Sequence, residues 1–514
     1  MSLLQAGFGS SGDDYTIDDS LRFRASATAY LSRTPATAGN RKTWTWSAWV
    51  KRGVLGTYQT LFGAGSSSAV SPYETLLRFN DTNTLSLIIN GAGGIGGFAT
   101  TTALFRDSSA WYHVVAYVDM SASGQANKAR IYINGVLQSV TYGNFSSTDD
   151  TQVNNTVIHR VGANSYSSAN YVDGYLTEVN FIDGQALDPT DFGEFDEDTG
   201  VWKPLAYTGT YGTNGFYLNG VGVTDQSGNG NNWTNNNLNL STSTATTYDQ
   251  MKDTPSLVDE NAGNFCTLNP LNKGTAASSS NANLTYSCGA NSAITGSIGI
   301  TSGKWYWEIE TPTARCLLGI INSSATLNTY IGVNANGWGY YGINGNKYNS
   351  GATAYGATFT TTDVIAVAFD ADAGTLTFYK NNTSQGTAFT GLTSGPYFPA
   401  VSDDTLAGAT GNFNFGQRPF AYTPPTGFKK LNTFNLPDST IENGSDYFNT
   451  VLYTGTGAAR SITVGFQPDF VWAKMRSSAE THRLADSVRG AGKVLYSNLT
   501  NAEATEATGI TSFN

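Results

Sequence analysis

The stretch from Asp363 to Ser402 most restricts the folds open to this chain. From Val364 to Phe369 every residue is apolar, which is typical of a strand buried on both faces. A polar turn follows at 370–374, and Leu376 and Phe378 then alternate with threonines, as in a half-buried strand. This pattern predicts an antiparallel β-meander with short polar hairpins.

The composition extends this prediction to the whole chain. A length of 514 residues exceeds what one hydrophobic core supports, so about three domains are expected. Charged residues make up only 13%, whereas there are 57 glycines and 28 tyrosines, a mixture of turn formers and β formers. We therefore predict an all-β protein with many short strands.

The charge balance restricts the partners. The 28 lysines and arginines against 39 aspartates and glutamates give a net charge of -11, and the basic residues do not cluster. No nucleic-acid partner is expected, because phosphate binding needs clustered positive charge. The sequence also lacks a run of about 18 apolar residues and a signal peptide at its start, so we expect no membrane insertion.

Four segments of the second half resemble one family. They are GKWYWEIE (303–310), DVIAVAFD (363–370), GTLTFYKNN (374–382) and GPYFPAVS (395–402). Together they resemble the SPRY domain, a β-sandwich used for binding, and the resemblance implies no catalytic chemistry. The closing segment NFGQRPFAYTPPTGFKKLNTFNLP (414–437) is similar to the terminal strand and tail of SPRY domains in phage and bacterial proteins. We expect this domain to span 263–437.

The first half resembles a different sandwich. Trp44 and Trp46 alternate with threonines, and the alternation changes phase near Trp49. WYHVVAYVD (111–119), ARIYINGVLQ (129–138) and VDGYLTEVNFID (172–183) resemble the laminin-G-like, concanavalin A-type lectin jelly roll. With the extension 184–204, which resembles a segment of marine phage tail-associated proteins, this domain is expected to span 20–204. The two resemblances imply tandem antiparallel β-sandwiches.

Three other segments complete the predicted organisation. Residues 1–19 are expected to be a leader that is flexible or held by a partner. Residues 205–262 are predicted to be a connector rich in Asn, Thr and Gly, and 438–514 resembles part of a small β-module of phage tail fibres. Because the last segment is strand-like without a following partner, we expect the chain to continue or to pair with another chain. The glycine-rich 91–97 is interpreted as a hairpin loop.

The cysteines predict neither a disulfide framework nor a zinc site. Cys266, Cys288 and Cys316 are the only three, and no two are spaced as CxxC. An odd number of cysteines is compatible with folding in a reducing cytoplasm. A Cys266–Cys288 bridge is the alternative.

One loop in the connector has the pattern of a cation site. Asp225, Ser227, Asn229 and Asn231 place oxygen atoms at alternate positions, as calcium loops do. The twelfth position is Asn236, which is not a carboxylate, so this would be a weak structural calcium site. The alternative is an Asx turn held by hydrogen bonds, with no cofactor bound.

Candidate catalytic residues are few. Glu308 and Glu310 share one strand face, as the paired acids of concanavalin A-like glycanases do, but the third acid of that pattern is missing. An edge or solvent-facing strand explains them as well. The histidines His113, His159 and His482 lie in different segments, and for His113 we expect a hydrogen-bonded structural role. The chain is therefore expected not to be an enzyme.

Aromatic residues on the predicted rims are the candidate binding groups, because rings stack on sugars while Asn, Asp and Thr hydrogen bond. The candidates in the second sandwich are Trp338, Tyr340, Tyr341, Tyr348 and Tyr355. The alternative for Trp338 and Tyr340 is that they alternate on a strand and fill the core. Further candidates in the first sandwich are Tyr166, Tyr171 and Asp173. The rims could equally hold neighbouring protein chains.

The resemblances imply a function. They indicate a non-enzymatic virion protein, a bacteriophage tail fibre or related appendage, that recognises a host-surface glycan or protein. The expected partners are other virion proteins and this receptor, the expected assembly is a homotrimer, and the expected location is the virion, assembled in the host cytoplasm. Two alternatives remain open: a virion adaptor or head decoration protein that docks on other capsid or baseplate chains, and a glycan-degrading enzyme.

Overall fold

The computed structural model describes residues 15–65, 74–89, 97–146, 150–165, 169–197, 199–406, 408–437, 441 and 444–514. The chain divides into two compact units, one of Met1–Phe195 with Trp202–Asp438 and one of Asp196–Val201 with Ser439–Asn514. Leader residues 1–14, residues 91–96 of the predicted glycine-rich loop, and Tyr166 lie outside the described residues. Within the described ranges no helix is long and apolar enough to cross a membrane.

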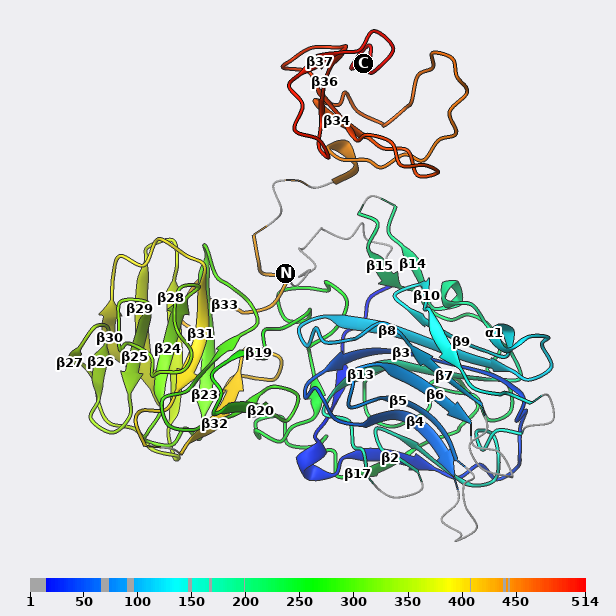
Figure 1. The fold of residues 1–514 in the computed structure, drawn as a ribbon. Coiled ribbons are helices and arrows are strands. Elements are labelled where there is room, and N and C mark those ends of the chain that lie inside the picture. Colours follow the sequence, from blue (N-terminus) through cyan, green and yellow to red (C-terminus); the bar gives the residue numbers. More distant parts are fainter. Residues whose placement is uncertain are drawn as a thin grey trace. The chain divides into compact units, whose positions relative to one another are not determined.

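The first sandwich consists of two eight-stranded antiparallel sheets (Figure 1). The β3 sheet has the order β10 (Val136–Leu137), β9 (Ala129–Ile133), β8 (Trp111–Asp119), β3 (Thr43–Arg52), β13 (Gly174–Asp183), β1 (Ser20–Phe23) and β18 (Gln250–Met251), with β16 (Phe216–Leu218) also paired to β13. The β4 sheet has the order β11 (Val140–Tyr142), β7 (Phe98–Thr101), β6 (Leu85–Ile89), β5 (Glu74–Phe79), β4 (Gln59–Gly65), β12 (Ile158–Val161), β2 (Tyr30–Arg33) and β17 (Thr234–Asn236). Short elements at its margins are η1 (Ala25–Ala27), α1 (Gln125–Lys128), η2 (Pro189–Asp191) and the hairpin β14 (Gly193–Phe195)–β15 (Trp202–Pro204).

The segment 205–262, predicted as a connector, is part of this sandwich. Strand β16 pairs with β13, β17 with β2, and β18 with β1. These pairings bring 216–251 beside strands that precede it by some 40 to 230 residues, so they leave no signal in the local pattern. The structure therefore extends the first sandwich well beyond residue 204.

Strand β3 shows why the outer face of the first sandwich is not exposed. Trp44, Trp46 and Val50 face the core between the two sheets, while Trp49 faces away from it and joins a second buried cluster. The β3–β8 register runs unbroken from Thr43 to Lys51, so the predicted phase change near Trp49 is wrong. The outer face of β3 carries Trp49 among the polar Thr45, Ser47 and Lys51, and all four are buried because a second layer of protein covers this face.

The second sandwich also has two antiparallel sheets (Figure 1). The β24 sheet has the order β19 (Leu268–Lys273), β22 (Ala293–Gly296), β31 (Tyr397–Ser402), β24 (Leu317–Asn322), β25 (Gly337–Tyr341), β26 (Asn346–Tyr348) and β27 (Ala352–Ala354). The β23 sheet has the order β20 (Ala277–Ser280), β21 (Thr285–Cys288), β32 (Ala409–Asn414), β23 (Lys304–Glu310), β28 (Val364–Asp370), β29 (Thr375–Lys380) and β30 (Thr383–Phe389), with β33 (Lys429–Lys430) parallel to β23.

The predicted meander and its doubly buried strand are confirmed. Strands β28, β29 and β30 pair consecutively and antiparallel. Ile365, Val367 and Phe369 enter the sandwich core, whereas Ala366 and Ala368 lie on the outer face beneath Phe420 and Phe428. The tail after β32 therefore covers the outer face of β28, which explains the uninterrupted apolar run.

The second unit holds a small antiparallel sheet, β34 (Phe470–Ala473), β35 (Arg483–Asp486), β36 (Lys493–Tyr496) and β37 (Ala504–Thr505), preceded by η3 (Gly444–Asp446). The all-β prediction and the two successive sandwiches are thus confirmed.

Candidate functional site

Tyr340 lies in the core of the second sandwich. Its side chain is fully buried, and its hydroxyl donates to the carbonyl oxygen of Ala357. Its ring centroid is 5.2 Å from those of Phe359 and Phe378. The core alternative therefore describes Tyr340, because no ring face is free for a ligand.

Trp338 and Tyr355 are only partly buried and pack on the same core. The Trp338 ring stands edge-on to that of Tyr397 at 5.4 Å. The Tyr355 hydroxyl donates to Gly386 O at 2.5 Å and accepts the N–H of Phe378 at 3.2 Å. Both side chains therefore close the margin of the sandwich, with part of each ring left open to solvent.

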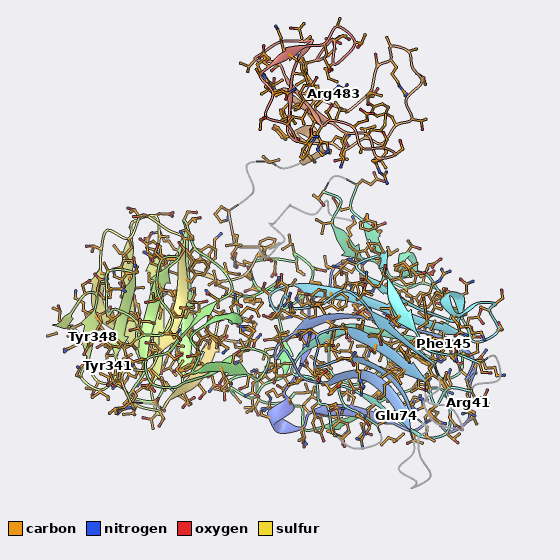
Figure 2. The ribbon with its side chains drawn as sticks, in the orientation of Figure 1. Arg41, Glu74, Phe145, Tyr341, Tyr348 and Arg483 are labelled. Atoms are coloured by element: carbon orange, nitrogen blue, oxygen red, sulfur yellow. The ribbon has the colours of Figure 1, made fainter. Side chains whose placement is uncertain are left out.

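Tyr341 and Tyr348 lie on the opposite, outer face of the β24 sheet (both are labelled in Figure 2). Their ring centroids are 5.8 Å apart, and Tyr330 stands edge-on to Tyr348 at 6.3 Å. The Tyr341 hydroxyl donates to the carboxylate of Asp404, which also pairs with Arg315 at 3.5 Å. We call Tyr330, Tyr341, Tyr348, Arg315 and Asp404 the outer tyrosine patch.

Exposed aliphatic side chains border this patch. Leu406 is 62% exposed, and its N–H donates to Asp404 at 2.8 Å. Ile343, in the turn after Tyr341, is 45% exposed, and Val333 is 41% exposed. The patch therefore combines an ion pair, tyrosine edges and solvent-facing aliphatic groups.

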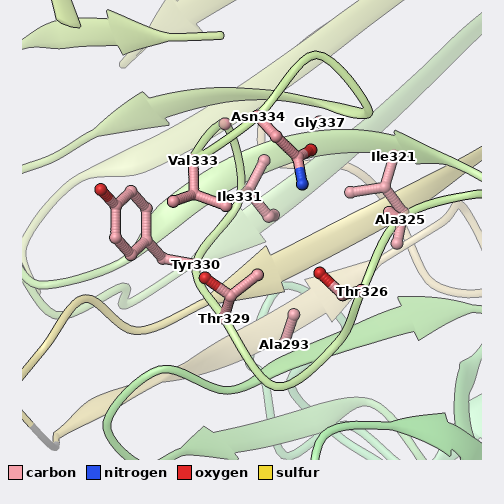
Figure 3. Close-up of a pocket in the computed structure, with 11 residues that line it drawn as sticks. Ala293, Ile321, Ala325, Thr326, Thr329, Tyr330, Ile331, Val333, Asn334 and Gly337 are labelled. Atoms are coloured by element: carbon pink, nitrogen blue, oxygen red, sulfur yellow. The ribbon is translucent and has the colours of Figure 1, made fainter. Parts of the chain in front are cut away.

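A shallow pocket adjoins the patch (Figure 3). It is lined by Ile321, Ala325, Thr329, Tyr330 and Val333 among others, and its cavity volume is about 10 Å³. A volume of that order holds about one water molecule. The pocket is therefore a depression of the surface and too small for a ligand or a partner's side chain.

The predicted calcium loop is closed by hydrogen bonds. The Asp225 carboxylate accepts the N–H groups of Tyr217, Ser227 and Asn231 at 2.8–2.9 Å and the Ser227 hydroxyl at 2.9 Å. Asn229 and Asn231 turn their amide N–H groups toward backbone carbonyls of 212–215, and the Arg33 guanidinium donates to Asn231 Oδ1. Donors thus occupy the oxygens that a cation would need, and a cationic group sits beside them, so the geometry favours the Asx-turn alternative.

Glu308 and Glu310 are buried in the central strand β23, so the expectation of an edge or solvent-facing strand is wrong. Glu308 accepts the N–H groups of Ala421 and Tyr422 at 2.7 and 2.9 Å and the Tyr306 hydroxyl at 2.9 Å. Burial raises the pKa of Glu308, although these hydrogen bonds oppose the shift. Glu310 pairs with Arg418 at 2.8 Å. Both acids fasten the tail 418–422 to the sheet rather than face one another across a cleft.

The buried histidines have structural roles, as expected for His113. Its Nδ1 accepts the indole N–H of Trp202 at 3.0 Å, so Nε2–H donates to Ser47 Oγ at 2.8 Å. Burial lowers its pKa to about 3. His159 bonds the backbone of Asn154 and Val157, and burial lowers its pKa to about 4. The half-exposed His482 lies in the second unit, against the ring of Trp472.

The three thiols are buried and free, so the alternative Cys266–Cys288 bridge is not formed. Burial raises the pKa of Cys266 and of Cys316 to about 11. A reactive thiolate is therefore disfavoured at both positions.

Asp173 joins the two sandwiches, and this role was not foreseen. Its carboxylate accepts the N–H groups of Asn281 and Ala282 at 3.0 and 2.6 Å. Residues 281–283, the tip of the β20–β21 hairpin, all have left-handed φ angles of 56 to 60°. The carboxylate thus caps a strained turn. Tyr171, the other described candidate of the first sandwich, lies 6.1 Å from the ring of Tyr30.

Lys51 forms the second junction. Its ammonium is fully buried and donates to Asp253 at 2.8 Å, to Asn264 Oδ1 at 2.7 Å and to Phe265 O at 2.9 Å. The Trp111 indole N–H also donates to Asp253, at 3.2 Å. A lysine directly after Trp49 and Val50 in a tryptophan-rich strand was the available sequence signal, because a buried ammonium requires a carboxylate partner.

Comparisons with known proteins agree with this architecture. Residues 25–193 match the concanavalin A-like lectin/glucanases superfamily, 304–418 match the SPRY domain, and 443–514 match a domain of unknown function (DUF7483). The chain is 33% identical over 139 residues to the E3 ubiquitin-protein ligase RKP of Arabidopsis thaliana. The matched stretch makes up 26% of this chain and 11% of the ligase.

Similar solved structures include the SPRY domain of human HERC1, at 20% identity over 28% of this chain and 96% of that one, with a TM-score of 0.26. Another is the TRIM65 PSpry domain, at 16% identity over 29% of this chain and 89% of that one, with a TM-score of 0.25. The two family matches, together with the observed sheets, show a concanavalin A-like sandwich followed by a SPRY sandwich.

Proposed function

We propose that this chain is a non-enzymatic binding protein of a virion, a bacteriophage tail fibre or related appendage, whose SPRY sandwich holds a host-surface receptor through the outer tyrosine patch. The domain order and the phage-like segments 184–204 and 414–437 support the virion setting. Three buried, free thiols are compatible with assembly in a reducing host cytoplasm before release in the particle.

The outer tyrosine patch carries the proposal. Leu406 offers an exposed aliphatic group next to Asp404 of the Arg315–Asp404 ion pair, and the exposed Val333 lines the depression beside Tyr330. Ile343, two residues after Tyr341, is exposed as well. Tyr341 is 7% exposed, so it presents an edge rather than a free ring face. Sugar stacking needs such a face, so the patch is better suited to a protein receptor than to a glycan.

The surroundings of Glu308 and Glu310, the two acids considered for catalysis, favour receptor binding over glycan cleavage as the function. Glu308 is held by two backbone N–H groups and a tyrosine, and Glu310 by Arg418. Cleavage of host polysaccharide by the purified chain, abolished by Glu308→Gln, would restore the glycanase alternative.

Binding of the full chain to host cells tests the proposal. Leu406→Glu should weaken binding about tenfold or more, because a buried charge at the contact costs over about 1.4 kcal/mol. Leu271→Glu is the matched control, since Leu271 is also 62% exposed but lies on β19. Protease treatment of the cells should abolish binding. Equal binding by both variants would refute the patch, and selective binding on a glycan array would assign the receptor to sugars.

A further inference from the structure

Lys51, Asp253 and Asn264 meet at the junction of the two sandwiches. Lys51 lies on β3, whereas Asp253 and Asn264 lie in the segment that leads from β18 to β19. The Lys51 and Asp253 side chains are 0% exposed, and Asn264 is 8% exposed. The Trp111 indole N–H donates to Asp253 at 3.2 Å, and the ring of Tyr175 lies 5.7 Å from Lys51 Nζ. An amine, a carboxyl group and a carboxamide are thus held together away from bulk water.

The amine of Lys51 faces the carboxamide of Asn264. Lys51 Nζ is 2.7 Å from Asn264 Oδ1, and Asn264 Nδ2 donates to Ser109 O at 2.9 Å, which fixes the plane of the amide. Because a C=O bond is about 1.2 Å long, Nζ lies within about 3.9 Å of the carbonyl carbon Cγ. Reacting atoms in a productive geometry are about 3–3.5 Å apart. The amine is therefore one small side-chain movement from the carbon that a nucleophile would attack.

Asp253 is placed to move the protons of this amine. Its Oδ2 and Oδ1 atoms are 2.8 and 3.1 Å from Lys51 Nζ. Burial raises the pKa of Asp253, although the Lys51 ammonium opposes the shift. Transfer of one proton from the ammonium to the carboxylate leaves two uncharged groups, which avoids the desolvation cost of two buried charges. It also frees the electron pair of Nζ, so Asp253 meets the geometric requirement of a general base.

We propose that Lys51 and Asn264 form an isopeptide bond in the folded protein, with Asp253 as the catalytic acid and base. The Nζ electron pair attacks Cγ of Asn264, and the C=O pair moves onto Oδ1. Nζ and Nδ2 are then bonded to the same carbon, so the carboxyl group that contacts Nζ comes within reach of Nδ2. Asp253 protonates Nδ2 and takes the proton that Nζ loses.

The products balance without a further reactant. The C=O bond forms again, the Cγ–Nδ2 bond breaks, and one molecule of ammonia leaves. One amide replaces another, so nothing is oxidised or reduced, and Asp253 ends as the carboxyl group with which it began. Loss of ammonia to the solvent, together with the exclusion of water from the buried site, prevents the reverse reaction and hydrolysis.

The bond joins two segments that are 213 residues apart in the chain. Lys51 belongs to the first sandwich, and Asn264 lies just before β19 of the second. A covalent link across so long a loop restricts the unfolded chain and keeps the two sandwiches together when one of them opens. The bond uses no residue of the outer tyrosine patch, so it does not rest on the proposed receptor binding.

Mass spectrometry of the denatured full-length chain tests this. The wild-type protein should be lighter than its sequence by about 17 Da, the mass of one ammonia molecule. Trypsin should release residues 43–52 joined to residues 253–273, because a bond to Nζ blocks cleavage after Lys51. Full sequence mass with ordinary cleavage after Lys51 would overturn the proposal. A loss of about 18 Da, the mass of water, with the link at Asp253 would also overturn it.

Variants separate the roles of the three side chains. Lys51→Arg keeps a positive charge beside Asp253 but has no primary amine, so it should have its full sequence mass. Lys128→Arg is the matched control: Lys128 is also buried but donates to Phe145 O, and this variant should keep the loss of about 17 Da. Asp253→Asn, with its fold checked by circular dichroism, should form the bond at least about a hundredfold more slowly. Unchanged bond formation in folded Asp253→Asn would refute the role of Asp253, and the wild-type mass decides the proposal if this variant does not fold.

Discussion

Replacement of Glu178 by Gln should remove a pH dependence of stability from the first sandwich. Glu178 lies in the bulge of β13 with a left-handed φ of 52° and is 7% exposed. Its two oxygens contact the hydroxyls of Tyr15 at 2.7 Å and Tyr217 at 2.6 Å, and these hydroxyls contact each other at 2.8 Å. Tyr15 precedes β1, so the cluster holds the start of the described chain against β13.

Proton counting indicates the charge state of this cluster. Three oxygen–oxygen contacts need three protons to be hydrogen bonds, and the two phenols supply two. The third must come from the carboxyl group of Glu178. Tyr211, the nearest other phenol, donates instead to Asn180, and Asp225 accepts the backbone N–H of Tyr217. The ring of three hydrogen bonds is therefore complete only with a neutral Glu178.

The pKa points the same way. Burial raises the pKa of Glu178 from 4.5 to about 7, although the hydrogen bonds from Tyr217 and Tyr15 oppose the shift. A raised carboxyl pKa means that the folded state binds the proton more tightly than the unfolded one. The stabilisation that the neutral Glu178 provides is complete below the pKa of this group in the unfolded state, and it is lost as the pH rises through its pKa in the folded state. At about 1.4 kcal/mol per pH unit, the loss is about 3 kcal/mol.

Urea unfolding of the wild-type protein and Glu178→Gln at a series of pH values measures this effect. An amide reproduces the neutral acid, since it donates through N–H and accepts through oxygen. The variant should match the wild type near pH 4 and be more stable by up to about 3 kcal/mol near pH 8. Subtracting the two curves removes the contributions of all other groups. Parallel curves over this range would refute the neutral carboxyl.

Two further predictions concern the junction and the calcium loop. Lys51→Met should destabilise the protein by about 3–5 kcal/mol, because Asp253 is left buried without its partner. Adding Asp253→Asn to this variant should reduce the loss of stability. Thermal unfolding of the single and double variants checks this, and equal losses of stability in the two would contradict it. Because donors fill the Asp225 carboxylate, neither calcium nor a chelator should change the melting temperature, and a calcium-dependent rise would support a cation site.

The sequence predicted the parts of the fold that depend on near neighbours. The β28–β30 meander follows from a doubly apolar strand and two polar turns within 27 residues, from 363 to 389. Strands β16, β17 and β18 could not be predicted, because they pair with β13, β2 and β1 far along the chain. They are only two or three residues long, so no period can be read from them and they are not distinguished from a connector.

The sequence predicted the candidate site only in part, again because contacts between segments far apart in the chain leave no local pattern. Alternation correctly separates Trp338 and Tyr340 from Tyr341, but it cannot say which face of β25 is open. That depends on the 323–336 loop, which lays Tyr330 and Ile331 over the outer face of the sheet. Leu406 and Asp404 lie in one loop that is 63 residues beyond Tyr341 in the chain, so the pattern around β25 does not show that they join the patch.

The buried acids have a common physical explanation in the way these sheets are covered. Irregular segments, rather than helices, lie on the outer faces of both sandwiches, and buried irregular backbone leaves N–H groups without ladder partners. A carboxylate accepts several such groups at once. Carboxylates that hold a distant backbone N–H are Glu308 with 421 and 422, Asp173 with 281 and 282, and Asp183 with 40 and 214. Asp249 with 239 and Asp403 with 409 do the same over 10 and 6 residues. Acids at alternate strand positions, which suggested catalysis at Glu308, therefore follow from the need to fasten covering loops.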